Sequence, residues 1–307
     1  MKIATVGKGG SGKTTIAGTL ARLFANNGHK VLAIDGDPNP NLALTLGMTR
    51  SDADEINYIP PSVMEMVKED DGSLKLVMSV TKDKFLKTYA ASAPENIDLI
   101  VMGKPEDGSA GSGCMCSSHR AVRGIITEMS AYGEFTVTDM EAGLEHLKRG
   151  TAANVDTMLV VIEPYYRSLE AGERTAKLAK ELNVPNILMV ANKIKTDADK
   201  AAIDQFCQKH DLPIIGYIPL EEKFIEAERQ EKAPIDFDSK SPGAKAIYDI
   251  SLKLAELSTR THPPKPIPDH FSLFAKGYAE GKRAVKYNKE KYGAYDKEAI
   301  HESKDDK

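Results

Sequence analysis

Short runs of apolar residues alternate along the chain with longer segments in which apolar residues recur every three or four positions. Several short runs, such as MLVVI and ILMVA, are continuously apolar, which is typical of strands buried on both faces of a sheet. The longer segments have the period of amphipathic helices. The pattern predicts strands at 2–6, 31–34, 97–102, 135–138, 157–162, 187–191 and 213–218, and helices at 14–26, 120–131, 169–182, 198–210 and 243–257.

This alternation predicts an α/β fold with a mostly parallel central sheet, helices on both faces, and ligands at the carboxyl ends of the strands. Residues 50–96 are less regular and rich in charge, so we interpret them as an insertion that contains one short strand at 74–80. A proline-led, charged segment begins at Thr261 with THPPKPIPDH. We therefore expect one domain over residues 1–260 and a C-terminal extension over 261–307.

The composition of the 307 residues narrows the class of protein. Hydrophobic residues make up 41% and charged residues 28%, which indicates a globular chain with a substantial core. A net charge of −4 argues against a protein that mainly coats nucleic acid, and no apolar run is long enough to span a membrane. The first residues lack the pattern of a secretory signal, and three cysteines do not form a disulfide framework. We expect a cytoplasmic protein.

A phosphate-binding loop lies between the first predicted strand and the first predicted helix. The sequence GKGGSGKT matches G-x-x-x-x-G-K-[ST], in which the glycines let successive N–H groups turn toward a phosphate. Lys13 would contact the β and γ oxygens, and the Thr14 hydroxyl would bind Mg²⁺. The predicted loop and the helix start comprise Gly7, Lys8, Gly9, Gly10, Ser11, Gly12, Lys13, Thr14 and Thr15.

The lysine at the beginning of this loop makes the motif more specific. Lys8, in KGGSGKTT, is typical of the deviant Walker A motif, and on this motif the chain resembles the MinD/ParA/nitrogenase-iron-protein group of ATPases over about residues 1–255. The resemblance implies a SIMIBI-type P-loop NTPase fold and ATP hydrolysis. It also implies a homodimer in which Lys8 reaches the nucleotide of the other subunit, as an arginine finger does.

Three aspartates occupy positions where this group has residues of the nucleotide and magnesium site. Asp35 and Asp37 follow the second predicted strand, and Asp139 ends the strand FTVTD. The resemblance implies that Asp37 orients the attacking water, that Asp139 faces the metal-bound water, and that Asp35 lies near the Mg²⁺ shell. A carboxylate at the end of a strand can instead cap a helix, and for Asp35 this alternative remains open.

The base of the nucleotide is expected near the end of two later strands. Asn192 and Lys193 match the adenine-contacting position of the group, and Pro219 ends a strand near the expected base site. A guanine-selecting N-K-x-D motif is not met, because residues 192–195 read Asn-Lys-Ile-Lys. ATP or ADP is therefore favoured over guanine nucleotides.

A pair of cysteines suggests a metal site. Cys114 and Cys116 lie in GSAGSGCMCSSHR, where flanking glycines allow both thiols to reach one Zn²⁺ or Ni²⁺ ion. A second copy related by a two-fold axis would complete a site of four thiolates. His119 is either a third ligand or a residue at a helix start, and the cysteine pair has a structural or redox alternative. Cys207 is expected to pack in the core.

The cysteine spacing also separates subfamilies. In the nitrogenase iron protein, a second cysteine follows the DxxGD switch, whereas residues 139–146 of this chain read DMEAGLEH and contain none. The combination of G-C-x-C with DMEAGLEH resembles CooC-type accessory ATPases, which insert nickel into carbon monoxide dehydrogenase, and their relatives that serve acetyl-CoA synthase. The resemblance implies a nucleotide-gated nickel carrier with one of these enzymes as its client.

Two other functions compete with this interpretation. A positioning ATPase that binds DNA or membrane would use the basic, partly aromatic residues 271–292, although Gly277 and Gly281 disfavour a helix there. The cysteine pair has no role in such a protein. An iron–sulfur carrier or electron-transfer ATPase would use Cys114 and Cys116 from each chain.

Overall fold

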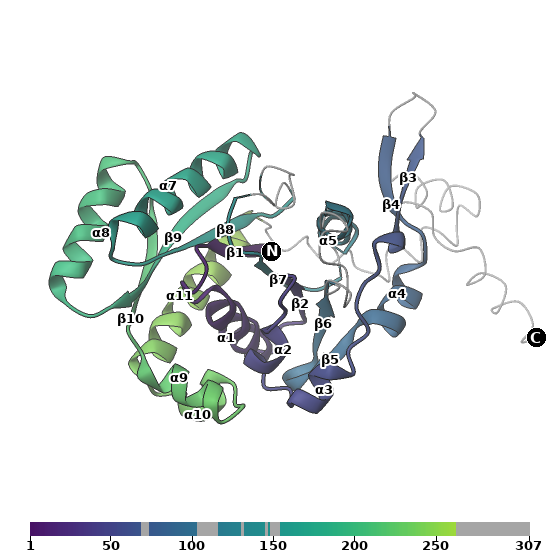
Figure 1. Ribbon diagram of the computed structural model, residues 1–307, viewed down its shortest axis with the longest axis horizontal. Coiled ribbons are helices and arrows are strands. Elements are labelled where there is room, and N and C mark those ends of the chain that lie inside the picture. The colour runs from purple at the N-terminus through teal and green to yellow at the C-terminus, as the bar shows by residue number, and fades with distance from the viewer. Residues whose placement is uncertain (69–73, 103–115, 130–131, 145–146, 148–153, 262–307) are drawn as a thin grey trace, which may run out of the picture. The chain divides into compact units, whose positions relative to one another are not determined.

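A computed structural model describes residues 1–68, 74–102, 116–129, 132–144, 147 and 154–261. Its centre is an eight-stranded sheet in the order β10-β9-β8-β1-β7-β2-β6-β5 (Figure 1). All neighbouring strands are parallel except β5, which pairs antiparallel with β6. The strands are β1 (Lys2–Gly7), β2 (Val31–Gly36), β5 (Ala91–Ala93), β6 (Ile97–Val101), β7 (Phe135–Met140), β8 (Thr157–Ile162), β9 (Asn186–Ile194) and β10 (Ile214–Pro219).

Helices cover both faces of the sheet, and alternate strand residues pack against each layer (Figure 1). On β1, Ile3 belongs to one core cluster, while Ala4 and Val6 belong to the other. The cluster of Ile3 includes residues of α1 (Lys13–Asn26), α2 (Leu42–Thr45) and α11 (Pro242–Thr261). The second cluster includes residues of α5 (Cys116–Glu128), α7 (Tyr166–Glu181) and α8 (Asp197–Lys209). The predicted fold class and the seven predicted strands are thus confirmed.

The insertion between β2 and β6 contains more structure than its sequence pattern predicts. Besides the expected strand β4 (Leu74–Met78), it contributes a hairpin partner, β3 (Met64–Lys68), and the antiparallel edge strand β5. The sequence pattern did not identify β3 and β5, because four of the five residues of β3 are exposed and β5 has only three residues, so neither gives an apolar run. The insertion also holds α3 (Arg50–Asp54), η1 (Pro61–Val63), α4 (Lys82–Tyr89) and η2 (Pro94–Asn96).

Two short helices, α9 (Glu222–Arg229) and α10 (Pro234–Asp238), follow the last strand and were not predicted. Arg22 of α1 is buried, and its guanidinium donates two hydrogen bonds, of 2.8 and 2.7 Å, to the Asp236 carboxylate of α10. It also donates to the Leu46 carbonyl at 2.7 Å. This ion pair fixes α10 to the helix that follows the phosphate loop.

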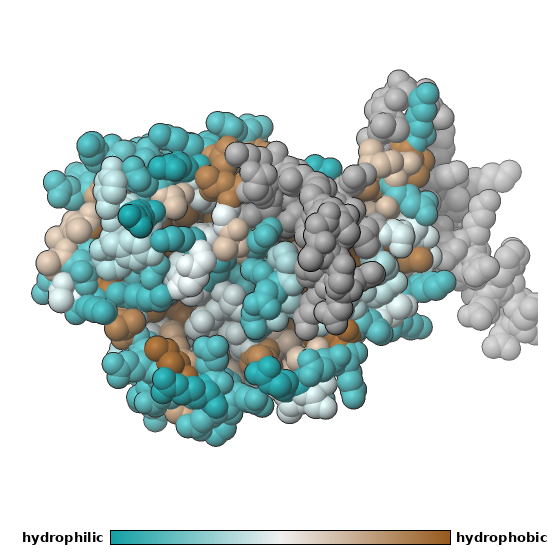
Figure 2. Space-filling view, in the orientation of Figure 1, coloured by the Kyte–Doolittle hydropathy of each residue, from teal (hydrophilic) through white to brown (hydrophobic). Residues whose placement is uncertain are grey.

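Contacts divide the chain into residues 1–257 and a second unit of residues 258–307. Residues 262–307 lie outside the described residues, so the domain boundary at 260 and the extension stay predictions. Within the described ranges, no helix has both the length and the apolar character needed to cross a membrane. The face seen in Figure 2 is mostly hydrophilic, with small hydrophobic patches.

Candidate active site

The predicted phosphate loop joins the carboxyl end of β1 to the amino end of α1, in the middle of the sheet. Gly7 has φ +152°, and a Cβ there would lie 2.6 Å from the Val161 carbonyl oxygen, so a larger residue does not fit. Gly12 precedes the helix with φ +95°. The loop therefore needs glycine at both ends, and the positive end of the α1 dipole faces it.

The two lysines of the loop have different environments. Lys13 is buried, and its Nζ donates a hydrogen bond to the Lys8 carbonyl across the loop at 3.3 Å. The Lys8 side chain lies on the exposed rim, where its Nζ is 5.1 Å from the centre of the Tyr165 ring. This arrangement is compatible with contact of Lys13 with the nucleotide of its own subunit and of Lys8 with the nucleotide of a partner subunit. Both roles stay predictions.

Asp139 lies directly beside the predicted magnesium ligand. The Thr14 hydroxyl donates to one carboxylate oxygen at 2.5 Å, and the Thr5 hydroxyl donates to the other at 3.0 Å. Burial raises the pKa of Asp139 to about 6, while the bond from Thr14 and the charge of Lys13 oppose the rise. Hard oxygen donors of this kind suit Mg²⁺, so Thr14, with Asp139 behind it, fits the ion that the motif implies.

Asp35 is hydrogen-bonded to the backbone of the loop that follows β2. Its carboxylate accepts hydrogen bonds from the backbone N–H groups of Asp37 at 3.1 Å, Asn41 at 2.9 Å and Leu42 at 2.8 Å. Burial raises the pKa of Asp35 to about 7, and the neighbouring Asp139 adds to the rise. The geometry matches the capping alternative, because Leu42 begins α2.

Asp37 lies on this anchored loop and is partly exposed. Its carboxylate accepts a hydrogen bond from the backbone N–H of Asn39 at 2.8 Å. The register of β2 and β7 places Asp35 opposite Asp139, so the loop of Asp37 starts at the same sheet edge as Asp139. The role of Asp37 in orienting water stays a prediction.

The predicted base-site residues contact the phosphate loop itself. The Asn192 side-chain amide donates to the Ser11 carbonyl at 2.7 Å, and Lys193 Nζ donates to the Gly10 carbonyl at 2.6 Å. Pro219 pairs with Ile194 on the neighbouring strand and so lies at the same edge. The contact of these residues with adenine stays a prediction, and their visible role is to support the loop.

Sequence reasoning missed two residues that adjoin the loop, Glu163 and Tyr165. Glu163 Oε1 lies 2.8 Å from Lys193 Nζ, and the Tyr165 hydroxyl donates to Glu163 Oε2 at 2.8 Å. Both residues follow the apolar strand β8, which is adjacent to β1. The position of Glu163 after a buried strand is the same signal that singled out Asp35 and Asp139.

The candidate metal residues fall largely outside the described residues. Cys114 lies in the segment 103–115, and Cys116 and His119 begin α5, where the structure describes the backbone alone. Among the side chains that the structure does describe, no group of three or more His, Cys, Asp or Glu residues could hold a metal ion. Cys207 is buried in α8, as expected, and burial raises its pKa to about 11. The metal site therefore stays a prediction.

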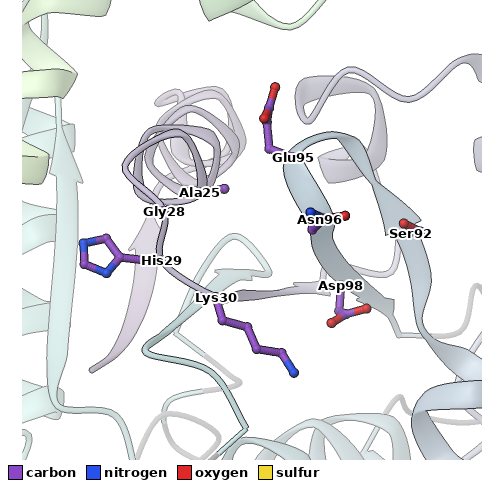
Figure 3. Close-up of a pocket in the computed structure, with 8 residues that line it drawn as sticks. All are labelled: Ala25, Gly28, His29, Lys30, Ser92, Glu95, Asn96 and Asp98. Atoms are coloured by element: carbon purple, nitrogen blue, oxygen red, sulfur yellow. The ribbon is translucent and has the colours of Figure 1, made fainter.

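A separate pocket of about 410 Å³ lies at the amino ends of β2 and β6, the sheet edge opposite the phosphate loop (Figure 3). Its charged groups already have partners in the fold. Lys30 Nζ lies 3.7 Å from the centre of the Tyr132 ring, and the Tyr132 hydroxyl donates to Asp98 at 2.5 Å. His29 Nδ1 lies 2.7 Å from a carboxylate oxygen of Glu134. We therefore do not identify this pocket with the nucleotide site.

Comparison with known proteins supports a nucleotide-binding site at this phosphate loop. Residues 2–235 match the family described as the CobQ/CobB/MinD/ParA nucleotide binding domain. The chain is 37% identical to an uncharacterized ATP-binding protein of Methanocaldococcus jannaschii, over 85% of this chain and 100% of that protein. It is 34% identical to the carbon monoxide dehydrogenase accessory protein CooC of Rhodospirillum rubrum, over 72% and 84% of the two chains.

Among solved structures, the cell division ATPase MinD of Pyrococcus furiosus has the same fold. Its TM-score is 0.63 at 21% identity, covering 83% of this chain and 98% of that one. The sheet order, the phosphate loop and the family match together lead to one assignment. The chain belongs to the CobQ/CobB/MinD/ParA nucleotide-binding family and is a P-loop ATPase, for which the family implies ATP or ADP and Mg²⁺ as ligands.

Proposed function

We propose that this ATPase is a cytoplasmic homodimer that carries nickel and inserts it during maturation of carbon monoxide dehydrogenase or acetyl-CoA synthase. The observation that carries the proposal is the Cys114-Met115-Cys116 sequence in a chain 34% identical to a carbon monoxide dehydrogenase accessory protein. Thiolates are ligands that Ni²⁺ and Zn²⁺ both accept. Two chains related by a two-fold axis would supply four of them to one ion.

ATP hydrolysis in this proposal uses the residues gathered at the carboxyl edge of the sheet. Mg²⁺, when bound, neutralises charge on the β and γ phosphates. Thr14 would hold the ion, and Asp139 would orient the Thr14 hydroxyl and the metal-bound water. Lys13 would contact the phosphates of its own subunit, Lys8 would stabilise the developing charge in the partner subunit, and Asp37 would orient the attacking water.

The strand register suggests how nucleotide and metal would communicate. The loop of Asp37 is tied to Asp35, and Asp35 pairs with Val101 on β6. The segment that carries Cys114 follows β6 directly in the chain. A change at Asp37 on ATP binding would thus begin one strand away from the cysteine segment. Because coupling between two ligands is reciprocal, metal should favour the same dimer that ATP favours.

Anaerobic native mass spectrometry with Ni²⁺ or Zn²⁺, with and without ADP or ATP, tests this proposal. We expect one metal ion per dimer, loss of the ion in the Cys114→Ala/Cys116→Ala double variant, and retention in a Cys207→Ala control. Cys207 is a matched control because it is the buried cysteine of α8. A double variant that binds the same metal with the same stoichiometry would contradict the proposal.

The same two thiols also favour a second candidate, an iron–sulfur carrier or electron-transfer ATPase. Four cysteines from two chains are the ordinary ligand set of such a cluster. Native mass spectrometry separates the candidates, because a bound cluster adds the mass of iron and sulfide rather than of one ion. Absorbance near 400 nm after anaerobic purification would support the cluster.

A further inference from the structure

A buried carboxylate next to the phosphate loop has no part in the function proposed above. We propose that Glu163 is a positioning residue: it holds Lys193 against the phosphate loop and so sets the geometry in which the loop binds nucleotide. The inference depends on nucleotide binding by this ATPase and does not involve the metal.

Both oxygens of the Glu163 carboxylate are engaged. The Glu163 side chain is 9% exposed, and its Oε1 lies 2.8 Å from Lys193 Nζ. Oε2 accepts the hydrogen bond from the Tyr165 hydroxyl at 2.8 Å. The Lys193 side chain is 37% exposed, so the carboxylate is the shielded partner of this ion pair and the ammonium group keeps access to water. The carboxylate therefore restricts Lys193 to one direction.

That direction is toward the loop. Lys193 Nζ donates to the Gly10 carbonyl at 2.6 Å, so a single ammonium group joins Glu163 to the loop. The Lys193 backbone has φ +61°, a left-handed conformation that is unfavourable for a residue with a side chain. Such conformations persist where the surrounding structure enforces them, and here the conformation accompanies the return of the side chain to Gly10.

Anchoring these carbonyls has a consequence for phosphate binding. The carbonyl of one residue and the N–H of the next point in opposite directions, because they share one planar peptide unit. Lys193 fixes the Gly10 carbonyl and Asn192 fixes the Ser11 carbonyl. The N–H groups of Ser11 and Gly12 are thereby turned to the other side. The Ser11 N–H donates there to the Lys8 carbonyl at 3.2 Å, so of the two it is the Gly12 N–H that can face a phosphate. Inward N–H groups are what a phosphate requires.

Tyr165 supports the carboxylate from its other side. It lies at the N-cap position of α7, and burial together with the bond to Glu163 raises the pKa of its hydroxyl. The hydroxyl thus stays protonated and donates to Glu163 at neutral pH. Its ring is also the one near Lys8 Nζ. Loss of the Tyr165 hydroxyl should loosen Glu163 without removing the charge that holds Lys193.

Titration with a fluorescent N-methylanthraniloyl-ADP and Mg²⁺ tests the inference in the full chain. We expect Glu163→Gln to weaken binding on the order of tenfold, about 1.4 kcal/mol, because Lys193 loses its charged partner while the side chain keeps its shape. Tyr165→Phe should weaken it less. Glu170→Gln is the matched control, because Glu170 lies on α7 and pairs with Arg174 of the same helix.

A double-variant cycle separates positioning from general stability. If Glu163 acts through Lys193, the Glu163→Gln/Lys193→Met chain should bind the analogue about as weakly as the weaker single variant. The inference is overturned if Glu163→Gln binds the analogue within twofold of the unaltered chain, whether or not its melting temperature falls. It is also overturned if the losses of affinity in the two single variants multiply in the double variant. The same ratios should hold in the Cys114→Ala/Cys116→Ala chain, so failure of the metal proposal would leave this result intact.

Discussion

Replacing Thr14 with valine removes one hydroxyl and preserves the shape of the side chain. In the structure, that hydroxyl donates to the fully buried Asp139 carboxylate at 2.5 Å, leaving Thr5 as the other side-chain donor. A hydrogen bond to a charged group contributes about 1.5–3 kcal/mol. We therefore expect Thr14→Val to lower the free energy of unfolding by about that amount. For a domain of this size the melting temperature should fall by about 3–12 °C.

The loss should depend on pH. The pKa of Asp139 is raised from 3.8 to about 6 in the folded chain, so this residue's contribution to stability is present below about pH 4 and is lost as pH rises toward 6. The hydrogen bond from Thr14 opposes the rise, and its removal moves the pKa higher. In Thr14→Val the decline therefore continues to a higher pH. The nearby charges of Lys13, Asp35 and Asp37 are common to both chains.

Differential scanning calorimetry in EDTA from pH 5 to pH 8, without nucleotide, measures this difference. The gap in melting temperature between the unaltered chain and Thr14→Val should widen as pH rises. Thr157→Val is the matched control, because Thr157 is fully buried and its hydroxyl has no hydrogen-bond partner among the described residues. That change should be neutral or stabilising by about 1 kcal/mol. An equal gap at pH 5 and pH 8, or equal losses in both variants, would refute the reasoning.

Three further predictions concern the loop, the core and the ion pair of α1. Gly7→Ala should weaken binding of fluorescent ADP at least tenfold, because its Cβ would lie 2.6 Å from the Val161 carbonyl; unchanged affinity would show that the loop accommodates it. Cys207, whose pKa is raised to about 11, should resist iodoacetamide at pH 8 in the native chain and react after unfolding, as peptide mass spectrometry would show. Asp236→Ala should lower the free energy of unfolding by about 1–3 kcal/mol, because the buried Arg22 guanidinium loses its partner, while the half-exposed Asp236 makes the loss smaller than for a fully buried pair. A free energy of unfolding from chemical denaturation within about 0.5 kcal/mol of that of the unaltered chain would count against this.

The core of the fold could be predicted because its signals are local. Strands buried on both faces are continuously apolar, and the phosphate loop needs a fixed set of residue types between a strand and a helix. Strand β5 and the exposed strand β3 escaped prediction although each pairs with the strand that follows it in the chain, because neither has an apolar run of its own. Three residues, or a strand with one buried position, carry no periodicity to detect.

In the candidate site, the positions of the residues could be predicted better than their roles. Residues named from the motif gather at one sheet edge, as the parallel order of the strands requires. The role of each carboxylate was harder to predict, because a carboxylate after a strand can bind a metal, cap a helix or form an ion pair with a lysine. Asp35 caps α2, Asp139 receives Thr14, and Glu163 pairs with Lys193. Only the partners distinguish these roles. The partner of Asp35 is seven residues away, whereas those of Asp139 and Glu163 come from other parts of the chain.

The central claim is that nucleotide controls metal binding at the cysteine pair. The most direct measurement is the Ni²⁺ affinity of the anaerobic protein, by competition with a chromophoric chelator, with ADP and with a non-hydrolysable ATP analogue. We predict different affinities in the two nucleotide states, and their ratio should equal the factor by which Ni²⁺ changes the preference of the protein for the ATP analogue over ADP. Both effects should vanish in Cys114→Ala/Cys116→Ala. Equal affinities with ADP and the ATP analogue, or a difference that persists without the cysteines, would contradict the claim.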